Sequence, residues 1–130
     1  MLDPAIKHLA SVGKNFGTVC VTLPNGQIAS HVMWVDADDE HVIFNTEVHR
    51  AKFKAIEESP NVTMSIWDAE NPYAYAEVRG RVVETVRGVE ARAHIDALAQ
   101  RYMGRDYPGE IESERVIVKI APDRQRSQNL

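Results

Sequence analysis

Polar and apolar residues alternate along most of the chain, and the period of the alternation marks the expected elements. Three segments have apolar residues three or four positions apart, as in a helix: residues 3–13, a short segment that stops at Ser59-Pro60, and residues 87–103. Six others have the two-residue period or the short apolar run that is typical of β-strands. They are residues 16–23, 28–36, 41–45, 61–68, 73–84 and 114–122. The predicted order is helix, three strands, helix, two strands, helix and strand.

Local signals predict where several of these elements begin and end. Asp3 followed by Pro4 indicates a helix start, because Asp accepts a hydrogen bond from a free backbone N–H and Pro fits the first helical turn. Asn25-Gly26 between two strands is a strong signal for a tight hairpin turn. Gly104 is expected to end the last helix. Strands joined by such short connections pair antiparallel.

Two of the strands indicate how the sheet is arranged. The segment 28–36 is apolar on both faces, so we expect it to be covered on both sides in the middle of the structure. The segment 73–84 has small or apolar residues on one face and large amphipathic residues, such as Tyr73 and Tyr75, on the other. The small face suits the inside of a curved barrel, and the large face is expected to meet a partner. The predicted fold class is mainly β with helices (α+β), a small six-stranded antiparallel barrel.

Composition narrows the classes of function. The 130 residues are expected to form one domain, residues 1–130, with a frayed polar tail at residues 122–130. A net charge of -4 argues against general affinity for nucleic acid or anionic membranes. The single Cys20 lies in an apolar run, so it is expected in the core of a cytoplasmic protein. The histidines lack metal-ligand spacing, and we expect no metal site.

The stretch FNTEVHRAKFKAIEESPNV, residues 44–62, has an unusual charge pattern. Arg50, Lys52 and Lys54 lie at the front of the expected helix, where the helix dipole disfavours each cation by about 0.3–1 kcal/mol. Thr46 is expected to cap this helix and to leave free backbone N–H groups near its first turn. Together these groups would bind a phosphate or a carboxylate. The alternative is a solvated basic face.

The residues of this region resemble a known family. The order of Thr46, Arg50-x-Lys52, the SPNV break, a strand ending in Trp67-Asp68, then NPY and VRGRV is similar to the core of the pyridoxamine 5′-phosphate oxidase-like split β-barrel proteins. The resemblance covers roughly residues 5–121 and is greatest to the B subgroup of flavin- or deazaflavin-dependent oxidoreductases. It implies the FMN-binding split-barrel fold and a homodimer with two flavin-type cofactors in grooves between the protomers.

The resemblance also implies which residues hold the cofactor. Thr46, Arg50 and Lys52, with the neighbouring Asn45, match the positions that hold the phosphate in that family. One strand is expected to run beside the ring system, and the partner protomer is expected to close the groove with a turn. The strand beside the ring system contains Ser30, His31, Val32, Met33 and Trp34. The residues expected from the partner's turn and from the strand after it are Asn71, Pro72, Tyr73 and Tyr75.

Departures from the family pattern favour one cofactor and one activity. Members that oxidise pyridoxamine phosphate have a basic C-terminal segment that IAPDRQRSQNL does not match, and Ser30 replaces an arginine near the flavin phosphate. We therefore expect coenzyme F-420, with FMN as the alternative cofactor. The first hypothesis is an F-420-dependent oxidoreductase that transfers a hydride to an unsaturated small organic substrate. The alternatives are an FMN-binding oxidoreductase and a non-catalytic protein that binds F-420, a flavin or a tetrapyrrole. The sequence identifies no catalytic acid or base.

Overall fold

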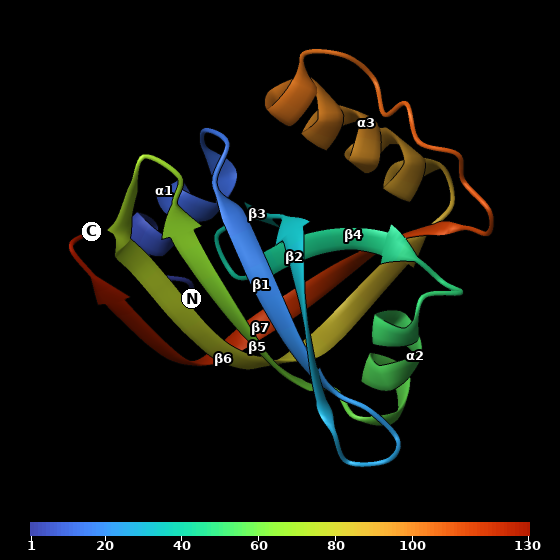
Figure 1. Cartoon of the computed structure of the whole chain (residues 1–130), viewed down its shortest axis with the longest axis horizontal. Coiled ribbons are helices and arrows are strands. Elements are labelled where there is room, and N and C mark those ends of the chain that lie inside the picture. The colour runs from blue at the N-terminus through green and yellow to red at the C-terminus, as the bar shows by residue number, and fades with distance from the viewer.

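The computed structural model describes residues 1–130 and contains one seven-stranded sheet with three helices (Figure 1). The helices are α1 (Pro4–Ser11), α2 (Ala51–Glu58) and α3 (Val89–Met103). The strands are β1 (Phe16–Thr22), β2 (Ile28–Trp34), β3 (Asp36–Ala37), β4 (Val42–Glu47), β5 (Asn61–Asp68), β6 (Asn71–Arg87) and β7 (Arg115–Gln128). The predicted order of elements is confirmed, except that the predicted strand 28–36 ends at Trp34 and a seventh strand, the two-residue β3, begins at Asp36.

The strands are arranged in the order β2-β1-β5-β6-β7-β4-β3, and all neighbours pair antiparallel. The sheet curls so strongly that β2, at one edge, contacts β4, which lies next to the other edge. Figure 1 shows the resulting curved wall, with α3 above it and α1 and α2 toward opposite sides. This is a split β-barrel with added helices, as the sequence predicted.

The curl depends on the small face of β6. Ala76 and Val78 are fully buried on this face, and the register of β6 against β7 shifts between Arg79 and Gly80. At Gly80 the carbonyl oxygen of Ala121 would lie 2.1 Å from a Cβ atom, so only glycine permits this close approach of the two strands. The prediction that the small residues of this segment line a tightly curved interior is confirmed.

Helices α1 and α2 complete the main core. Ile6 of α1 and Phe53 of α2 belong to the same cluster of 20 buried residues as the strands of the barrel. Helix α1 begins as predicted, because the Asp3 side chain accepts a hydrogen bond of 2.8 Å from the backbone N–H of Ala5 and Pro4 occupies the first turn. None of the helices is both long and apolar enough to cross a membrane.

Helix α3 packs outside the main core. Its buried residues Ile95, Leu98 and Tyr102 form a separate cluster with Phe16 and Trp34 at its edge. Another small cluster joins the start of the helix to β4 and β7; its members are Ile43, Ala91 and Ile117. The predicted buried face of this helix and the predicted end at Gly104, which has a left-handed conformation, are both confirmed. Because two small clusters hold α3 at a distance from the barrel core, a pocket remains beneath it.

Two expectations about the sheet differ from the structure. Strand β2 is an edge strand that pairs only with β1, and Ile28 and Val32 are 76% and 65% exposed. The polar segment 122–128, expected to fray, continues β7 and pairs with β6 up to Gln128 opposite Tyr75. The apolar content of a strand does not show whether other elements cover it. A polar segment can still form backbone hydrogen bonds with a long neighbouring strand. Cys20 is half-buried on the outer face of β1 rather than in the core.

Replacement of Gly80 by alanine is expected to destabilise the protein by about 1–3 kcal/mol, because the new methyl group would push against the backbone of β7. Urea unfolding of Gly80→Ala measures the change. Val83→Thr is the matched control, since Val83 lies on the same strand, is 47% exposed and is replaced by a residue of similar shape. If Gly80→Ala is as stable as the control, β6 and β7 can move apart at this position without a loss of stability, which contradicts the prediction.

Candidate functional site

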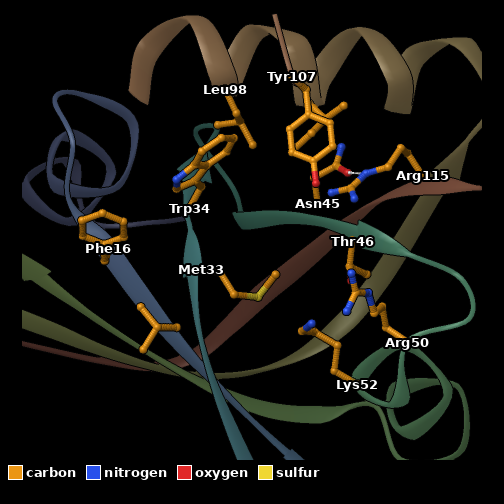
Figure 2. Close-up of a pocket in the computed structure, with 12 residues that line it drawn as sticks. Phe16, Met33, Trp34, Asn45, Thr46, Arg50, Lys52, Leu98, Tyr107 and Arg115 are labelled. Atoms are coloured by element: carbon orange, nitrogen blue, oxygen red, sulfur yellow. Dashed lines mark hydrogen bonds between the residues drawn. The ribbon is translucent and has the colours of Figure 1, made fainter. Parts of the chain in front are cut away.

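A pocket of about 400 Å³ lies between α3, the strands β2, β4 and β7, and the start of α2 (Figure 2). Its volume falls in the range of small-molecule and cofactor sites. Figure 2 shows Arg50 and Lys52 at one end of the pocket and aromatic side chains at the other, next to α3, with Arg115 beside Tyr107. The lining residues are Phe16, Val32, Met33, Trp34, Asn45, Thr46, Arg50, Lys52, Ile95, Leu98, Tyr107 and Arg115.

Lys52, Arg50 and Thr46 form the cationic end. Lys52 is half-buried and forms no ion pair, and burial, together with the positive charges of Arg50 and Arg115, lowers its pKa from the usual value. Arg50 has only a distant partner, since its Nη2 atom lies 3.9 Å from the carboxylate of Glu47. Glu47 is the one carboxylate near these cations, and it pairs at a distance with Arg50 and Arg115 but not with Lys52. Lys52 therefore keeps an unpaired charge that the neighbouring cations repel, which favours the binding of an anionic ligand.

The predicted capping role of Thr46 is wrong. Thr46 lies inside β4, where it is buried and pairs with Val116 of β7, and α2 begins only at Ala51. Arg50 is the residue at the N-cap, and its side chain makes no capping hydrogen bond. The strand runs on to Glu47 because that side chain is bonded into the loop before β7. The first turn of α2 therefore keeps backbone N–H groups without a side-chain acceptor.

Aromatic side chains form the other end of the pocket. Trp34 of β2 stacks on Tyr102 of α3, with ring centroids 5.0 Å apart and an interplanar angle of 6°. Tyr107, in the loop after α3, meets the edge of Trp34 at 6.2 Å and 87°. Tyr102 is held in turn by its hydroxyl, which accepts a hydrogen bond of 3.2 Å from the backbone N–H of Val35. This packing gives the pocket a stiff planar wall.

Arg115 lies in the wall between the two ends. Its Nε–H donates a hydrogen bond of 2.8 Å to Oδ1 of Asn45, and its guanidinium lies 5.2 Å from the ring centroid of Tyr107. Glu47, directly opposite in the β4–β7 register, is the nearest carboxylate, with 3.7 Å between Nη1 and Oε2. Burial is the main reason that the pKa of Arg115 lies below its usual value.

Asn45 connects this arginine to α3. Its Oδ1 accepts from Arg115, so its amide nitrogen donates, to the carbonyl oxygen of Ala91 at 3.0 Å and to Nδ1 of His94 at 3.0 Å. His94 must then carry its proton on Nε2, which donates to Asp36 at 3.0 Å. The orientation of Arg115 is therefore fixed by a chain of hydrogen bonds that ends on β3.

Glu47 is a buried carboxylate with a lowered pKa. Burial by itself raises the pKa, but hydrogen bonds from the backbone N–H groups of Ser113 and Glu112, at 2.9 and 2.8 Å, and the charge of Arg115 lower it by more. The side chain is only 1% exposed. Glu47 therefore stays ionised and fastens the loop after α3 to the end of β4.

The structure brings most of the sequence-predicted residues to one place. Seven of them line the pocket, namely Val32, Met33, Trp34, Asn45, Thr46, Arg50 and Lys52. Burial, and after it the charge of Lys52, lowers the pKa of His31. Ser30 is exposed and does not line the pocket. The turn residues Asn71, Pro72, Tyr73 and Tyr75 lie outside the pocket of their own chain. Their contribution from a partner protomer stays a prediction.

Sequence reasoning missed five lining residues: Phe16, Ile95, Leu98, Tyr107 and Arg115. The apolar ones follow the ordinary pattern of buried strand and helix positions, and nothing in that pattern separates a pocket wall from a core. Tyr107 lies in a loop of irregular structure. Arg115 had a weak signal, because an arginine that opens the apolar run VIVKI is an unusual choice for a buried strand.

The fold and the pocket define a split-barrel protein with a site for a small molecule, and comparison with known proteins places the chain in a family. The model of the pyridoxamine 5′-phosphate oxidase family matches residues 4–129, so the chain belongs to this family. No protein with a curated description matches its sequence.

Solved structures agree with this assignment. An F-420 reductase is 29% identical to this chain, with a TM-score of 0.82 over 96% of this chain and 98% of its own. A conserved hypothetical protein from Mycobacterium tuberculosis is 23% identical, with a TM-score of 0.75 over 98% of this chain and 84% of its own. General Stress Protein 26 from Bacillus anthracis is 21% identical, with a TM-score of 0.68 over 96% and 89%. The last two likenesses show the fold alone.

Replacement of Glu47 by glutamine is expected to lower the free energy of unfolding at pH 7 by about 1–3 kcal/mol, because the charge beside Arg115 is lost. It is also expected to flatten the acid dependence of stability. The pKa of Glu47 in the folded protein lies below the ordinary 4.5, so its contribution is complete above that value and is lost as the pH falls through the lowered pKa.

Urea unfolding between pH 7 and pH 3 measures both effects. Glu57→Gln is the control, because Glu57 is exposed and forms no ion pair. A Glu47→Gln variant whose stability falls with acid as steeply as that of the wild type would show that Glu47 has no lowered pKa.

Proposed function

We propose that the protein is an F-420-dependent oxidoreductase that transfers a hydride from the reduced coenzyme to an unsaturated small organic substrate. Family membership and the likeness to an F-420 reductase support an oxidoreductase of the flavin or deazaflavin type. The observation that carries the proposal is Lys52, a half-buried cation without an ion pair that faces the pocket. Such a cation in a folded protein is most simply explained by an anionic ligand.

The donor set of the pocket fits such a coenzyme. Arg50 and Lys52 offer a forked and a compact cation, and the hydroxyl of Thr46 lies beside them, a combination that suits the phosphate of the coenzyme tail. Met33 and Trp34 offer an apolar surface for a flat ring system. The bound coenzyme would supply the hydride chemistry itself.

The protein's own part in the reaction would be orientation and exclusion of water. Helix α3 covers the pocket, and Leu98 and Tyr107 close its side away from the cationic end. We assign no side chain as catalytic acid, and solvent would supply the proton that follows the hydride. FMN is the second cofactor candidate, because the same cations would hold its phosphate.

A homodimer is part of this proposal. The outer face of β2 leaves Ile28 and Val32 largely exposed, and Tyr73 at the start of β6 is 75% exposed. Exposed apolar side chains on a strand whose outer edge is unpaired are typical of surfaces that meet another chain. Because Val32 also lines the pocket, a partner bound on this face would reach the pocket with its own residues.

Lys52→Ala is expected to weaken the binding of F-420 by about 1–3 kcal/mol, because a charge-assisted hydrogen bond is lost. Titration of the purified protein with F-420, read by the fluorescence of Trp34 and Trp67, measures the affinity. Lys54→Ala is the matched control: Lys54 lies on the same helix, carries the same charge and is exposed. We expect a much smaller change for it.

Equal losses for the two lysine variants would mean that only the overall charge of α2 matters and that the phosphate position is wrong. No binding of F-420 or FMN to the wild-type protein would remove the proposal altogether. If F-420 binds, turnover with a panel of enones and tetrapyrroles separates a reductase from a protein that only binds the coenzyme.

Ile28→Asp is expected to convert the dimer to a monomer, because a charge would be buried at the centre of the proposed interface. Analytical ultracentrifugation measures the mass of both proteins. Val89→Asp is the control, since Val89 is 87% exposed but lies at the start of α3, away from β2. A wild-type protein that sediments as a monomer would contradict this part of the proposal.

A further inference from the structure

The side chain of Arg115 lies in the pocket wall, and its terminal nitrogens have no hydrogen-bond partner. We propose that Arg115 is a second oxyanion-binding position, which takes a carboxylate or carbonyl oxygen of the substrate rather than the phosphate of the coenzyme. This inference rests on the proposed function only in assigning a substrate to the same pocket.

Arg115 is 8% exposed, yet it uses little of its capacity to donate hydrogen bonds. An arginine has five N–H groups, and the Nε–H to Asn45 makes the one hydrogen bond of this side chain. Glu47 does not supply a second one, because 3.7 Å separates Nη1 from Oε2. Every side-chain nitrogen of Arg115 either has a hydrogen-bond partner or is accessible to solvent. The terminal N–H groups therefore open into the pocket that this residue lines.

The guanidinium is held in one orientation. The ring of Tyr107 lies over it, and Asn45 fixes its Nε side through the hydrogen bonds to α3 and to His94. A donor fork that is buried, charged and fixed before a ligand arrives is suited to a planar acceptor such as a carboxylate. This arrangement differs from that of Lys52, which has no hydrogen bond and forms no ion pair.

The position of Arg115 favours the substrate over the coenzyme phosphate. Figure 2 shows Arg115 beside Asn45 and Tyr107, under α3, whereas Lys52 and Arg50 lie toward α2. The surface next to Arg115 is the aromatic wall of Trp34 and Tyr107. The two cation positions therefore differ in their neighbours, and Arg115 fits the oxygen of a flat, conjugated molecule.

Such an oxygen is where charge collects during the proposed reduction. In this step a C–H bond of the reduced coenzyme would break, the coenzyme would be oxidised, and the hydride would form a new C–H bond at the β-carbon of a conjugated carbonyl compound. The C=C π pair then moves between the α-carbon and the carbonyl carbon, and the C=O π pair moves onto the carbonyl oxygen. A proton from solvent then completes the α-carbon. The guanidinium of Arg115 would stabilise the negative oxygen before that proton arrives.

Benzoate tests the inference without the coenzyme, because it is a flat aromatic carboxylate. We titrate the coenzyme-free protein with benzoate, with the neutral benzamide and with inorganic phosphate, and read the tryptophan fluorescence. Benzoate is expected to bind saturably and more tightly than benzamide. Arg115→Gln is expected to weaken benzoate by at least about tenfold and phosphate by less than about twofold, and Lys52→Ala is expected to do the reverse.

Arg115→Lys covers the case in which the glutamine variant does not fold, because lysine keeps the charge opposite Glu47 while it loses the planar fork and the Nε–H bond to Asn45. We expect this variant to unfold in urea like the wild type, to bind benzoate at least about fivefold more weakly and to bind F-420 within about twofold of the wild type.

Three results would overturn the inference: no saturable binding of benzoate to the wild type, an equal loss of benzoate and phosphate affinity in the arginine variants, or a loss of F-420 affinity in Arg115→Lys as large as in Lys52→Ala. Failure of the proposed function shows itself differently. In that case F-420 does not bind the wild-type protein, and the benzoate and phosphate titrations still decide the role of Arg115.

Discussion

The pocket depends on the pairing of β4 with β7 and on the buried Glu47 at the end of that ladder. Glu47 lies opposite Arg115 in the register and accepts hydrogen bonds from the backbone of residues 112 and 113. This contact keeps β4 extended past Asn45 and Thr46, which places both side chains on the pocket wall and delays the start of α2 until Ala51. A single buried carboxylate thus connects the strand ladder, the loop after α3 and the cations at the start of α2.

Much of the fold was predictable because it follows from local chemistry. The Asp3-Pro4 helix start, the Asn25-Gly26 hairpin and the buried face of α3 all depend on neighbours within a few residues. Long-range facts were not predictable in the same way. The edge position of β2 and the pairing of the polar segment 122–128 depend on which strands meet across the whole chain, and composition carries no record of that.

In the candidate site too, features that depend on the local sequence were predictable, and features that depend on long-range contacts were not. The cations Arg50 and Lys52 stood out in the sequence because they break a local preference of helices, and the structure brings them together in the pocket. Thr46 was assigned a local role as a helix cap, but its tertiary pairing with β7 prevails. Arg115 and Tyr107 come from another part of the chain, and their place beside Asn45 follows from the β4–β7 register and from α3. Residues 71–75, at the start of β6, lie outside the pocket, so their part in the site stays a prediction.

The strand order also determines when the pocket can exist during synthesis. Strand β7 lies between β6 and β4 in the sheet, although it follows both of them, and every other strand of this sheet, in the sequence. Until residues 115–128 have left the ribosome, β4 has no neighbour except the two-residue β3, and the chain that carries Thr46, Arg50 and Lys52 cannot join the barrel. Pairing over such long sequence separations is slow to form. Ligand affinity in a nascent chain therefore appears only after the last strand is inserted, so a coenzyme that binds this pocket acts on the finished barrel and does not guide its early folding.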